Sequence, residues 1–511
     1  MHPSDTKPLL FQRVLGWLAG KARENRLPLS AATVFGFLAH GFAFTNKLIN
    51  HDEANSLFSK GGTVALGRWG LALMDSIFPN VSMPWIYGII TIFLLAVSVC
   101  LLVHLIPLRS RWAQVLAAGL VMTFPSLTGT FGYMFTSSSY GAAFFLAVLA
   151  VWLIDRPEWL YWPLGLGCMI FSLGIYQAYI CLSAGLLVLI VIRRLLDGEN
   201  AVDVLRRGLG YVGFLILSLG IYYGFVQLSL KLTGQQMGSY AAEGLAFSPQ
   251  SLLGNGINAY RAFFSILSAG TFRLIPTAFC LRLHWILLII AAGLLVWRVL
   301  DRKPDPLTAV LLAAAMILFP LAVCAIYLFT APASIHTLVL YGFVDVYLLI
   351  LMLADGCRPV TGMRRFFLNL LPILCGGIIT VNMYIANEAY LNLHLRYENA
   401  YAFYTSLIAD IRQSPQFTEG SRLAVLGTWQ DPAFYDSNLD FTNTLTGVTG
   451  FKPDSYSRQR FVEQYIGFSI PFASEQEQAE ILASAEYARM PVYPYYGSMA
   501  KIGDIFVVKL S

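Results

Sequence analysis

The sequence predicts a polytopic α-helical membrane protein with a small extracytoplasmic α/β domain at its C-terminal end. Only 12% of the 511 residues are charged and 57% are hydrophobic, whereas soluble globular chains average roughly 25% charged residues. Apolar segments long enough to cross a bilayer, about 20 residues each as helices, recur along residues 1–386. Residues 387–511 are much more polar, so we expect a transmembrane domain followed by a second domain.

The apolar segments predict about eleven transmembrane helices. The expected spans are 28–49, 85–106, 112–126, 131–153, 160–174, 176–194, 208–231, 283–300, 307–330, 334–354 and 366–386. The boundaries are ambiguous between spans 112–126 and 131–153 and between spans 160–174 and 176–194, where some segments could be re-entrant.

Lysine and arginine predict the orientation, because they concentrate in cytoplasmic loops. They cluster in the N-terminal segment and then in alternate loops, near residues 109–111, 156, 193–207, 298–303 and 358–365. We therefore expect a cytoplasmic N-terminus, and with an odd number of spans the loop 50–84 and the tail lie outside. The net charge of +5 follows from these loops and does not indicate nucleic-acid binding.

The tail contains the pattern of a small α/β domain. Residues 389–413 predict a helix with an apolar face, and "RLAVLG" (422–427) predicts a buried strand. A second helix is expected at 475–488 and a closing strand at 505–510.

One external loop carries an unusual set of charges. The stretch "NHDEANSLFSKGGTVALGRWG" (50–70) places Asp52 and Glu53 at the membrane edge, followed by Lys60 and Arg68. We expect a helix over 53–60, a break at Gly61 and Gly62, and a second, amphipathic helix over 64–78 that lies along the membrane surface.

Two interpretations of this loop remain open from its residues. In the first, Asp52 only caps the helix that follows it, and the spacing alone favours this interpretation. In the second, a carboxylate accepts a proton from a hydroxyl while Arg68 and Lys60 neutralise a phosphate leaving group.

The order of several motifs resembles a known family. The acidic pair directly after the first span and "GRW" (67–69) in the same loop resemble the bacterial serotype-converting glucosyltransferases of O-antigen, of the GT-C fold class. Two internal blocks, "YMFTSSSYGAAFFLAVLAVWL" (133–153) and "SLGIYQAYICL" (172–182), and the closing "MPVYPYYGSMAKIGDIFVVKL" (490–510) are also similar.

The resemblance implies an inverting glycosyltransferase in the bacterial inner membrane. Its donor would be polyprenyl-phosphate-glucose, and its acceptor a hydroxyl of a surface polysaccharide such as the O-antigen of lipopolysaccharide, on the periplasmic side. By the same resemblance Asp52 matches the catalytic base, Glu53 its acidic neighbour and Arg68 the arginine of the motif. Tyr176 and Gln177 would line the cavity.

Three further residues complete the predicted site. Tyr133 opens the first internal block and is assigned to the substrate cavity. His336 stands where the family leads us to expect an arginine, so it is a candidate for the phosphate. Asp345 lies within a predicted span, where an ionisable group is costly; it either serves function or pairs with a polar side chain of a neighbouring helix.

The residues define no cofactor. The seven cysteines show no pairing or metal-binding spacing, and a divalent metal is possible but not indicated. The expected partners are the lipid-linked donor, the polysaccharide acceptor and membrane lipid. A lipid or polysaccharide transporter or flippase is the main alternative, although no internal repeat is visible, and a non-catalytic assembly or sensor subunit is the second.

Overall fold

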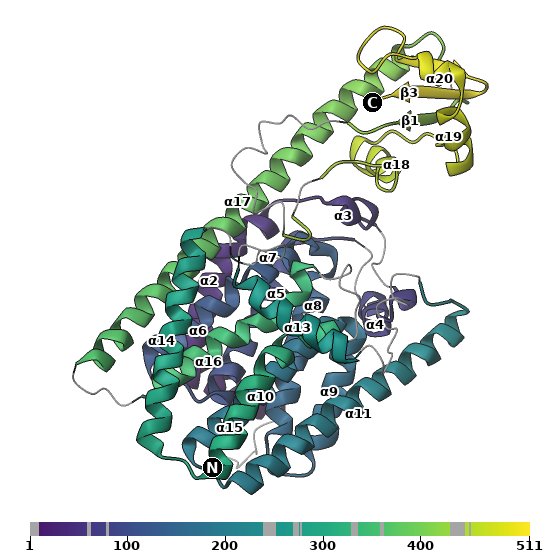
Figure 1. Ribbon diagram of the computed structural model, residues 1–511. Helices are drawn as coiled ribbons and strands as arrows, with labels where there is room; N and C mark the ends of the chain where they lie inside the picture. Colours follow the sequence, from purple (N-terminus) through teal and green to yellow (C-terminus); the bar gives the residue numbers. More distant parts are fainter. Residues whose placement is uncertain are drawn as a thin grey trace, which may run out of the picture.

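The computed structural model describes most of the chain. The described residues are 10–58, 63–77, 81–238, 252–268, 275, 278–328, 336–357, 362–418, 420–429, 445–448 and 451–511. They form a bundle of apolar helices with a small sheet beyond one end of it (Figure 1).

Within those residues the bundle is helical at each predicted span. Its longer elements are α2 (Arg26–Thr45), α5 (Pro84–Leu105), α6 (Arg111–Met122), α8 (Met134–Ile154), α9 (Tyr161–Ile175), α10 (Ile180–Asp197), α11 (Ala201–Thr233), α13 (Leu252–Ile266), α14 (Ala278–Arg302), α15 (Pro306–Val323), α16 (Val344–Asp355) and α17 (Met363–Gln413). Shorter elements among them are α7 (Pro125–Gly132), η2 (Gln177–Tyr179), η3 (Ala325–Leu328) and η5 (Thr337–Phe343).

The number of spans differs from the expected eleven. Nine helices among the described residues are long and apolar enough to cross a membrane, or up to ten if α6 and α7, bent by 45°, count as one. The predicted span 112–126 is this bent pair, because Pro125 begins a new helix. The predicted span 160–174 is α9, whose 15 residues are too few for that criterion.

Helices α2, α5, α8 and α9 pack in succession, α2 on α5, α5 on α8 and α8 on α9. Small residues allow this approach: a Cβ atom on Gly88 of α5 would come within 2.2 Å of the Phe44 side chain of α2. Close packing at small residues is a main source of association between helices in lipid.

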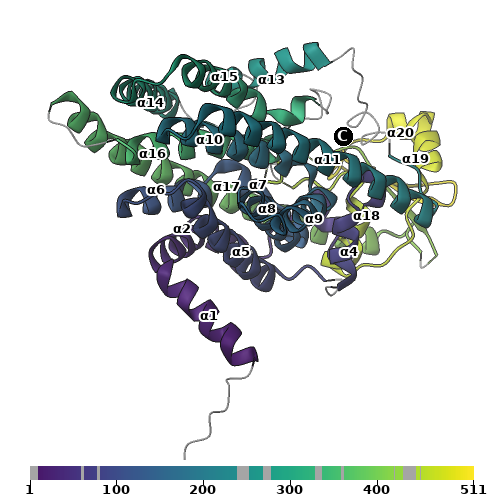
Figure 2. The same ribbon diagram turned by 90° about the horizontal axis from the view of Figure 1, so that it is seen from below.

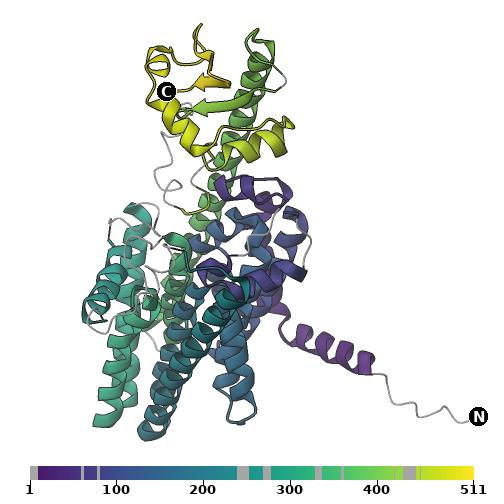
Figure 3. The ribbon, with the colours of Figure 1, turned by 90° about the vertical axis from the view of Figure 1, so that its right-hand side faces the viewer.

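At the N-terminus, α1 (Leu10–Glu24) projects away from the bundle, as Figures 2 and 3 show. Phe11 and Trp17 are exposed on it, and Lys21 and Arg23 lie in its last turn.

The last spanning helix continues into the tail. Helix α17 is 51 residues long and runs from the bundle to the sheet (Figure 1). The span expected at 366–386 and the helix expected at 389–413 are thus one element, and the predicted apolar face is buried at Leu407, Ile408 and Ile411. The predicted boundary between 386 and 387 falls inside α17, and the division into two domains stays a prediction.

The sheet has three strands in the order β1-β3-β2. Strand β1 (Arg422–Leu426) pairs in parallel with β3 (Ile505–Lys509), with Arg422 opposite Ile505, and β2 (Met499–Ile502) pairs antiparallel with β3. Helices α19 (Glu475–Leu482) and α20 (Ala485–Arg489) replace the single helix expected at 475–488, because the Ser484 side chain caps a new helix. Strand β2 was not predicted.

Candidate functional site

The acidic pair lies on a short helix, α3 (His51–Asn55), between the bundle and the sheet (Figure 1). Its N-cap is Asn50, whose side-chain oxygen accepts a hydrogen bond from the N–H of Glu53 at 2.8 Å. The interpretation in which Asp52 caps a helix over 53–60 is therefore wrong: α3 begins at His51 and ends at Asn55. Asn is a common cap residue, and its place just before the acidic pair was the overlooked signal.

The two acids have opposite surroundings. Glu53 is fully buried; its carboxylate forms an ion pair with Lys47, accepts a hydrogen bond from Ser82, and accepts another from the N–H of Phe135 at 3.2 Å. Phe135 lies in the first turn of α8, where unpaired N–H groups favour a negative charge. Glu53 thus joins α3 to the beginning of α8, and its carboxylate is already fully engaged by protein groups.

Asp52 keeps an accessible carboxylate. Its side chain is 36% exposed and lies 3.6 Å from the His51 ring. The hydroxyl of Tyr456, from the tail, lies close enough to Asp52 to be influenced by its charge, and the Tyr456 carbonyl accepts a hydrogen bond from Asn55 at 3.4 Å. Burial and then the charge of Asp52 raise the pKa of Tyr456. Asp52 therefore lies where the membrane part and the tail meet, with its carboxylate partly exposed.

Arg68 lies at a break between two helical segments. The predicted helix over 64–78 is instead η1 (Val64–Leu66) and α4 (Trp69–Ile77), separated by Gly67 at φ 74°. Glycine adopts this left-handed conformation without steric cost. A Cβ atom there would also lie 2.8 Å from the Tyr222 hydroxyl. Both the backbone conformation and the close approach of Tyr222 therefore favour glycine at this break.

The guanidinium of Arg68 is surrounded by aromatic side chains. One of its nitrogens donates to the Tyr140 hydroxyl at 3.2 Å, and its carbon lies 5.3 Å from the centroid of the Tyr176 ring. The rings of Tyr140 and Tyr176 stack at 4.5 Å. Tyr133 also lies close enough to Tyr176 to influence it electrostatically. We call Arg68, Tyr133, Tyr140, Tyr176 and His336 the arginine cluster.

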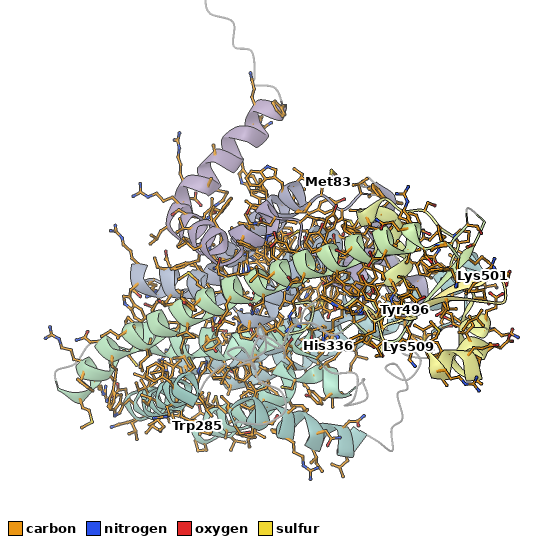
Figure 4. All side chains as sticks on the ribbon, turned by 90° about the horizontal axis from the view of Figure 1, so that it is seen from above. Met83, Trp285, His336, Tyr496, Lys501 and Lys509 are labelled. Carbon is orange, nitrogen blue, oxygen red and sulfur yellow. The ribbon has the colours of Figure 1, made fainter. Side chains whose placement is uncertain are left out.

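His336 joins the cluster from a distant part of the chain, just before η5; Figure 4 shows it toward the centre of the molecule. Burial and then the positive charge of Arg68 lower the pKa of His336 to about 4. The imidazole is therefore neutral at pH 7. Its Nδ1 atom is buried and has no hydrogen-bond partner among the described residues, so it can bind a further polar group there.

Gln177 supports the break at Gly67 through hydrogen bonds. Its side-chain nitrogen donates to the Leu66 carbonyl at 3.1 Å and to the Tyr222 hydroxyl at 2.8 Å, and that hydroxyl donates to the Gly67 carbonyl at 3.1 Å. These bonds hold the break that places Arg68. Tyr222 was not predicted, although a tyrosine in an apolar span is a visible signal.

The two halves of the site are joined by the first turns of α8. Phe135 contacts Glu53 and Tyr140 contacts Arg68; five residues of helix separate them by about 7.5 Å along the axis. Asp52 and Arg68 therefore belong to loops fixed on the same short piece of helix.

Two predicted residues fall elsewhere. Lys60 lies outside the described residues. Asp345 is fully buried at the beginning of α16 against α10, where a Cβ atom on Gly185 would meet its carboxylate at 2.1 Å. Neither carboxylate oxygen has a hydrogen-bond partner among the described residues, so the expected pairing with a neighbouring polar side chain is not found there. Its assignment to the substrate cavity stays a prediction.

The described residues contain no group of three or more His, Cys, Asp or Glu side chains that could hold a metal ion. The seven cysteines are free thiols.

The apolar helices are those of a multi-span membrane protein, and Arg68 lies among aromatic side chains at the end of the bundle nearer the sheet. The family model described as "Glucosyl transferase GtrII" matches residues 41–347, and the chain belongs to this family. The predicted resemblance is confirmed, the chain is a glucosyltransferase by family, and the transporter alternative is not favoured. The matched segment contains each predicted site residue, from Asp52 to Asp345. A comparison with proteins of curated function finds no match.

Proposed function

We propose that the protein transfers glucose from a polyprenyl-phosphate-linked donor to a hydroxyl of a surface polysaccharide such as O-antigen. The observation that supports this best is the arginine cluster, in which a partly buried cation and a neutral histidine with a free ring nitrogen meet among aromatic rings. A guanidinium binds phosphate with two parallel hydrogen bonds, and aromatic faces suit both a sugar ring and an isoprenoid chain.

In the proposed reaction Asp52 accepts the proton of the acceptor hydroxyl as its oxygen forms a bond to the anomeric carbon of glucose. The bond from that carbon to the phosphate oxygen breaks, and its electron pair stays on the phosphate. The leaving group gains one negative charge, which Arg68 stabilises and to which His336 donates a hydrogen bond. Attack and departure on opposite faces invert the anomeric configuration.

Glu53 is assigned a positioning role. Its carboxylate is occupied by Lys47, Ser82 and the first turn of α8, whereas Asp52 is open to an incoming hydroxyl. The base is therefore Asp52.

The proposed location is the bacterial inner membrane, with the N-terminus in the cytoplasm and the tail in the periplasm. The distribution of lysine and arginine supports this orientation. Donor and acceptor would then meet on the periplasmic side, where Tyr456 and its neighbours in the tail contact α3.

The test uses purified full-length protein in lipid nanodiscs with radiolabelled polyprenyl-phosphate-glucose and a polysaccharide acceptor. We expect label in the polysaccharide and release of polyprenyl phosphate in equal amounts, with the anomeric configuration of the product opposite to that of the donor by NMR. If the donor is not consumed and no label enters the polysaccharide, while an active glucosyltransferase works in a parallel assay, the proposal is refuted. Movement of intact donor across vesicles without transfer would favour a flippase.

A further inference from the structure

A short segment of the tail lies inside the membrane part of the molecule. Residues 445–448, here called the strap, form a turn in which the N–H of Val448 donates to the carbonyl of Leu445 at 3.2 Å. Both of these side chains are buried, at 0% and 2% exposure. The strap lies outside the segment that the family model matches, 41–347, so nothing in the family assignment gives it a role.

Helix α7 is shaped to receive the strap. Gly129 and Gly132, three residues apart and so on one face of α7, both face it. A Cβ atom on Gly129 would lie 2.6 Å from the Thr446 carbonyl oxygen, and one on Gly132 would lie 2.6 Å from the Gly447 carbonyl oxygen. Backbone meets backbone at both positions, so side chains larger than hydrogen are excluded from this face.

The strap is bonded to the loop that carries Asp52. The side-chain nitrogen of Asn50 donates to the Gly447 carbonyl at 3.0 Å and to the Gly132 carbonyl at 2.8 Å. Asn50 is also the N-cap of α3. One side chain therefore ties the strap, α7 and the helix of the proposed base together.

The strap is bonded equally to the loop that carries His336. The Thr337 hydroxyl accepts a hydrogen bond from the N–H of Thr446 at 2.9 Å, and the two threonine hydroxyls lie 3.2 Å apart. The Thr337 carbonyl in turn accepts from Ser126 of α7 at 2.6 Å. Thr337 directly follows His336, so this bond sets the beginning of η5.

The strap also contacts the arginine cluster. Gly447 adopts φ 91°, and a Cβ atom there would meet the Tyr133 ring at 2.7 Å. Tyr133 is near enough to Tyr176 to influence it electrostatically, and the Arg68 guanidinium lies over the Tyr176 ring.

We infer that the strap is a positioning element of the transfer reaction: Asn50, Thr337, Thr446 and Gly447 hold the loop of the base against the loop of the phosphate-binding histidine. This inference rests on the proposed function and extends it to a segment outside the family match. The strap aligns groups and touches no reacting atom. A misplacement of about 1 Å between reacting groups can slow a reaction by about 100-fold, so loss of the strap lowers kcat.

The test compares variants that change one side chain at a time among those bonded to the strap. Thr337→Val removes the hydroxyl that accepts from Thr446, and Thr337→Ser restores it. Asn50→Asp keeps the acceptor for the α3 cap but removes both donated bonds. We expect kcat to fall about 10- to 100-fold in Thr337→Val and Asn50→Asp, with the KM for the lipid donor within about 2-fold of wild type, and recovery of most activity in Thr337→Ser.

The matched control is Asn200→Asp, a second N-cap asparagine, whose side chain accepts from Val202 and Asp203 at the beginning of α11. It should leave kcat unchanged. Activities are expressed per folded molecule, with melting temperatures measured alongside.

Unchanged kcat in both Thr337→Val and Asn50→Asp would overturn the inference. Losses of activity that are explained by the folded fraction alone would also overturn it. So would a Thr337→Ser protein as inactive as Thr337→Val. These outcomes all require an active wild-type protein. If the wild type transfers no sugar, the proposed function itself fails, and the inference with it.

Discussion

Lys47 and Glu53 form an ion pair in which the carboxylate is fully buried and the lysine side chain is 27% exposed. Asp52, the neighbour of Glu53, is open to solvent. Two acids that are adjacent in the sequence therefore have different surroundings: Glu53 holds α3 in place, and Asp52 is the proposed base.

Glu53→Gln should destabilise the protein. It leaves the Lys47 ammonium without its anion and weakens the bond to the first turn of α8, a loss of roughly 3 kcal/mol for a buried pair. The measurement is the melting temperature in detergent. The double variant Lys47→Met with Glu53→Gln should regain part of the loss, because no unpaired charge remains. A Glu53→Gln protein as stable as wild type but inactive would instead identify Glu53 as the base.

Asp52→Asn should abolish turnover with little change in stability. The amide cannot accept the acceptor proton, and general-base catalysis contributes about 10²- to 10⁴-fold. The side chain is partly exposed and does not cap α3, so the melting temperature should be close to that of wild type. Full transfer activity in Asp52→Asn would place the base elsewhere.

Arg68→Lys should weaken both donor binding and turnover, because an ammonium replaces the planar fork of the guanidinium. Hydrogen bonds to a charged group contribute about 1.5–3 kcal/mol, which corresponds to roughly 10- to 100-fold in kcat/KM for the lipid donor. The matched control is Arg261→Lys on α13, where the arginine is exposed. Equal effects of the two substitutions would argue against a phosphate at Arg68.

His336 should make the protein less stable in acid. Burial and the charge of Arg68 lower its pKa from 6.5 to about 4 in the folded protein. Between those values the unfolded chain binds a proton that the folded one does not, so stability falls as pH decreases from about 6.5 to about 4. His336→Gln lacks this proton. Below pH 6.5 the melting temperature of wild type should fall more steeply than that of His336→Gln. Equal pH dependence of the two melting temperatures would contradict a buried, neutral His336.

Gly70→Ala should disturb the support of Arg68. A Cβ atom on Gly70 of α4 would lie 2.8 Å from the backbone carbon of Gly174 in α9, so the two helices must separate. Overpacking of this kind costs about 1–3 kcal/mol, and Arg68 lies two residues before Gly70. Melting temperature and transfer activity should both fall. Gly167→Ala in α9, with nothing within 4 Å of the new methyl group, is the control and should alter neither.

The apolar segments predicted the long helices of the bundle, since hydrophobic length is a local property, but they did not predict α7 and α13 as separate helices. They could not decide whether 112–126 is one span, because a single Pro125 bends α6 from α7. The strands β1 and β3 were predicted from buried apolar runs. The edge strand β2 has no fully buried position and no such run.

The site was predicted in its residues more than in its arrangement. Asp52, Arg68, Tyr176 and His336 came from the motifs, and the structure brings the last three together. The different surroundings of Asp52 and Glu53 depend on Lys47 and Ser82, which belong to no motif. The strap joins residues about 400 positions apart through Asn50 and Gly447, and no local pattern signals such a contact.

Helix α17 also sets the orientation of the sheet relative to the bundle. At 1.5 Å per residue its 51 residues extend about 77 Å, while a bilayer core takes only about 30 Å. Because α17 is one continuous helix, the number of its residues fixes both the distance of the sheet from the bundle and its rotation about the helix axis. Each residue inserted into α17 beyond the bundle would turn the sheet by about 100°, and the tail would reach the bundle with the wrong face.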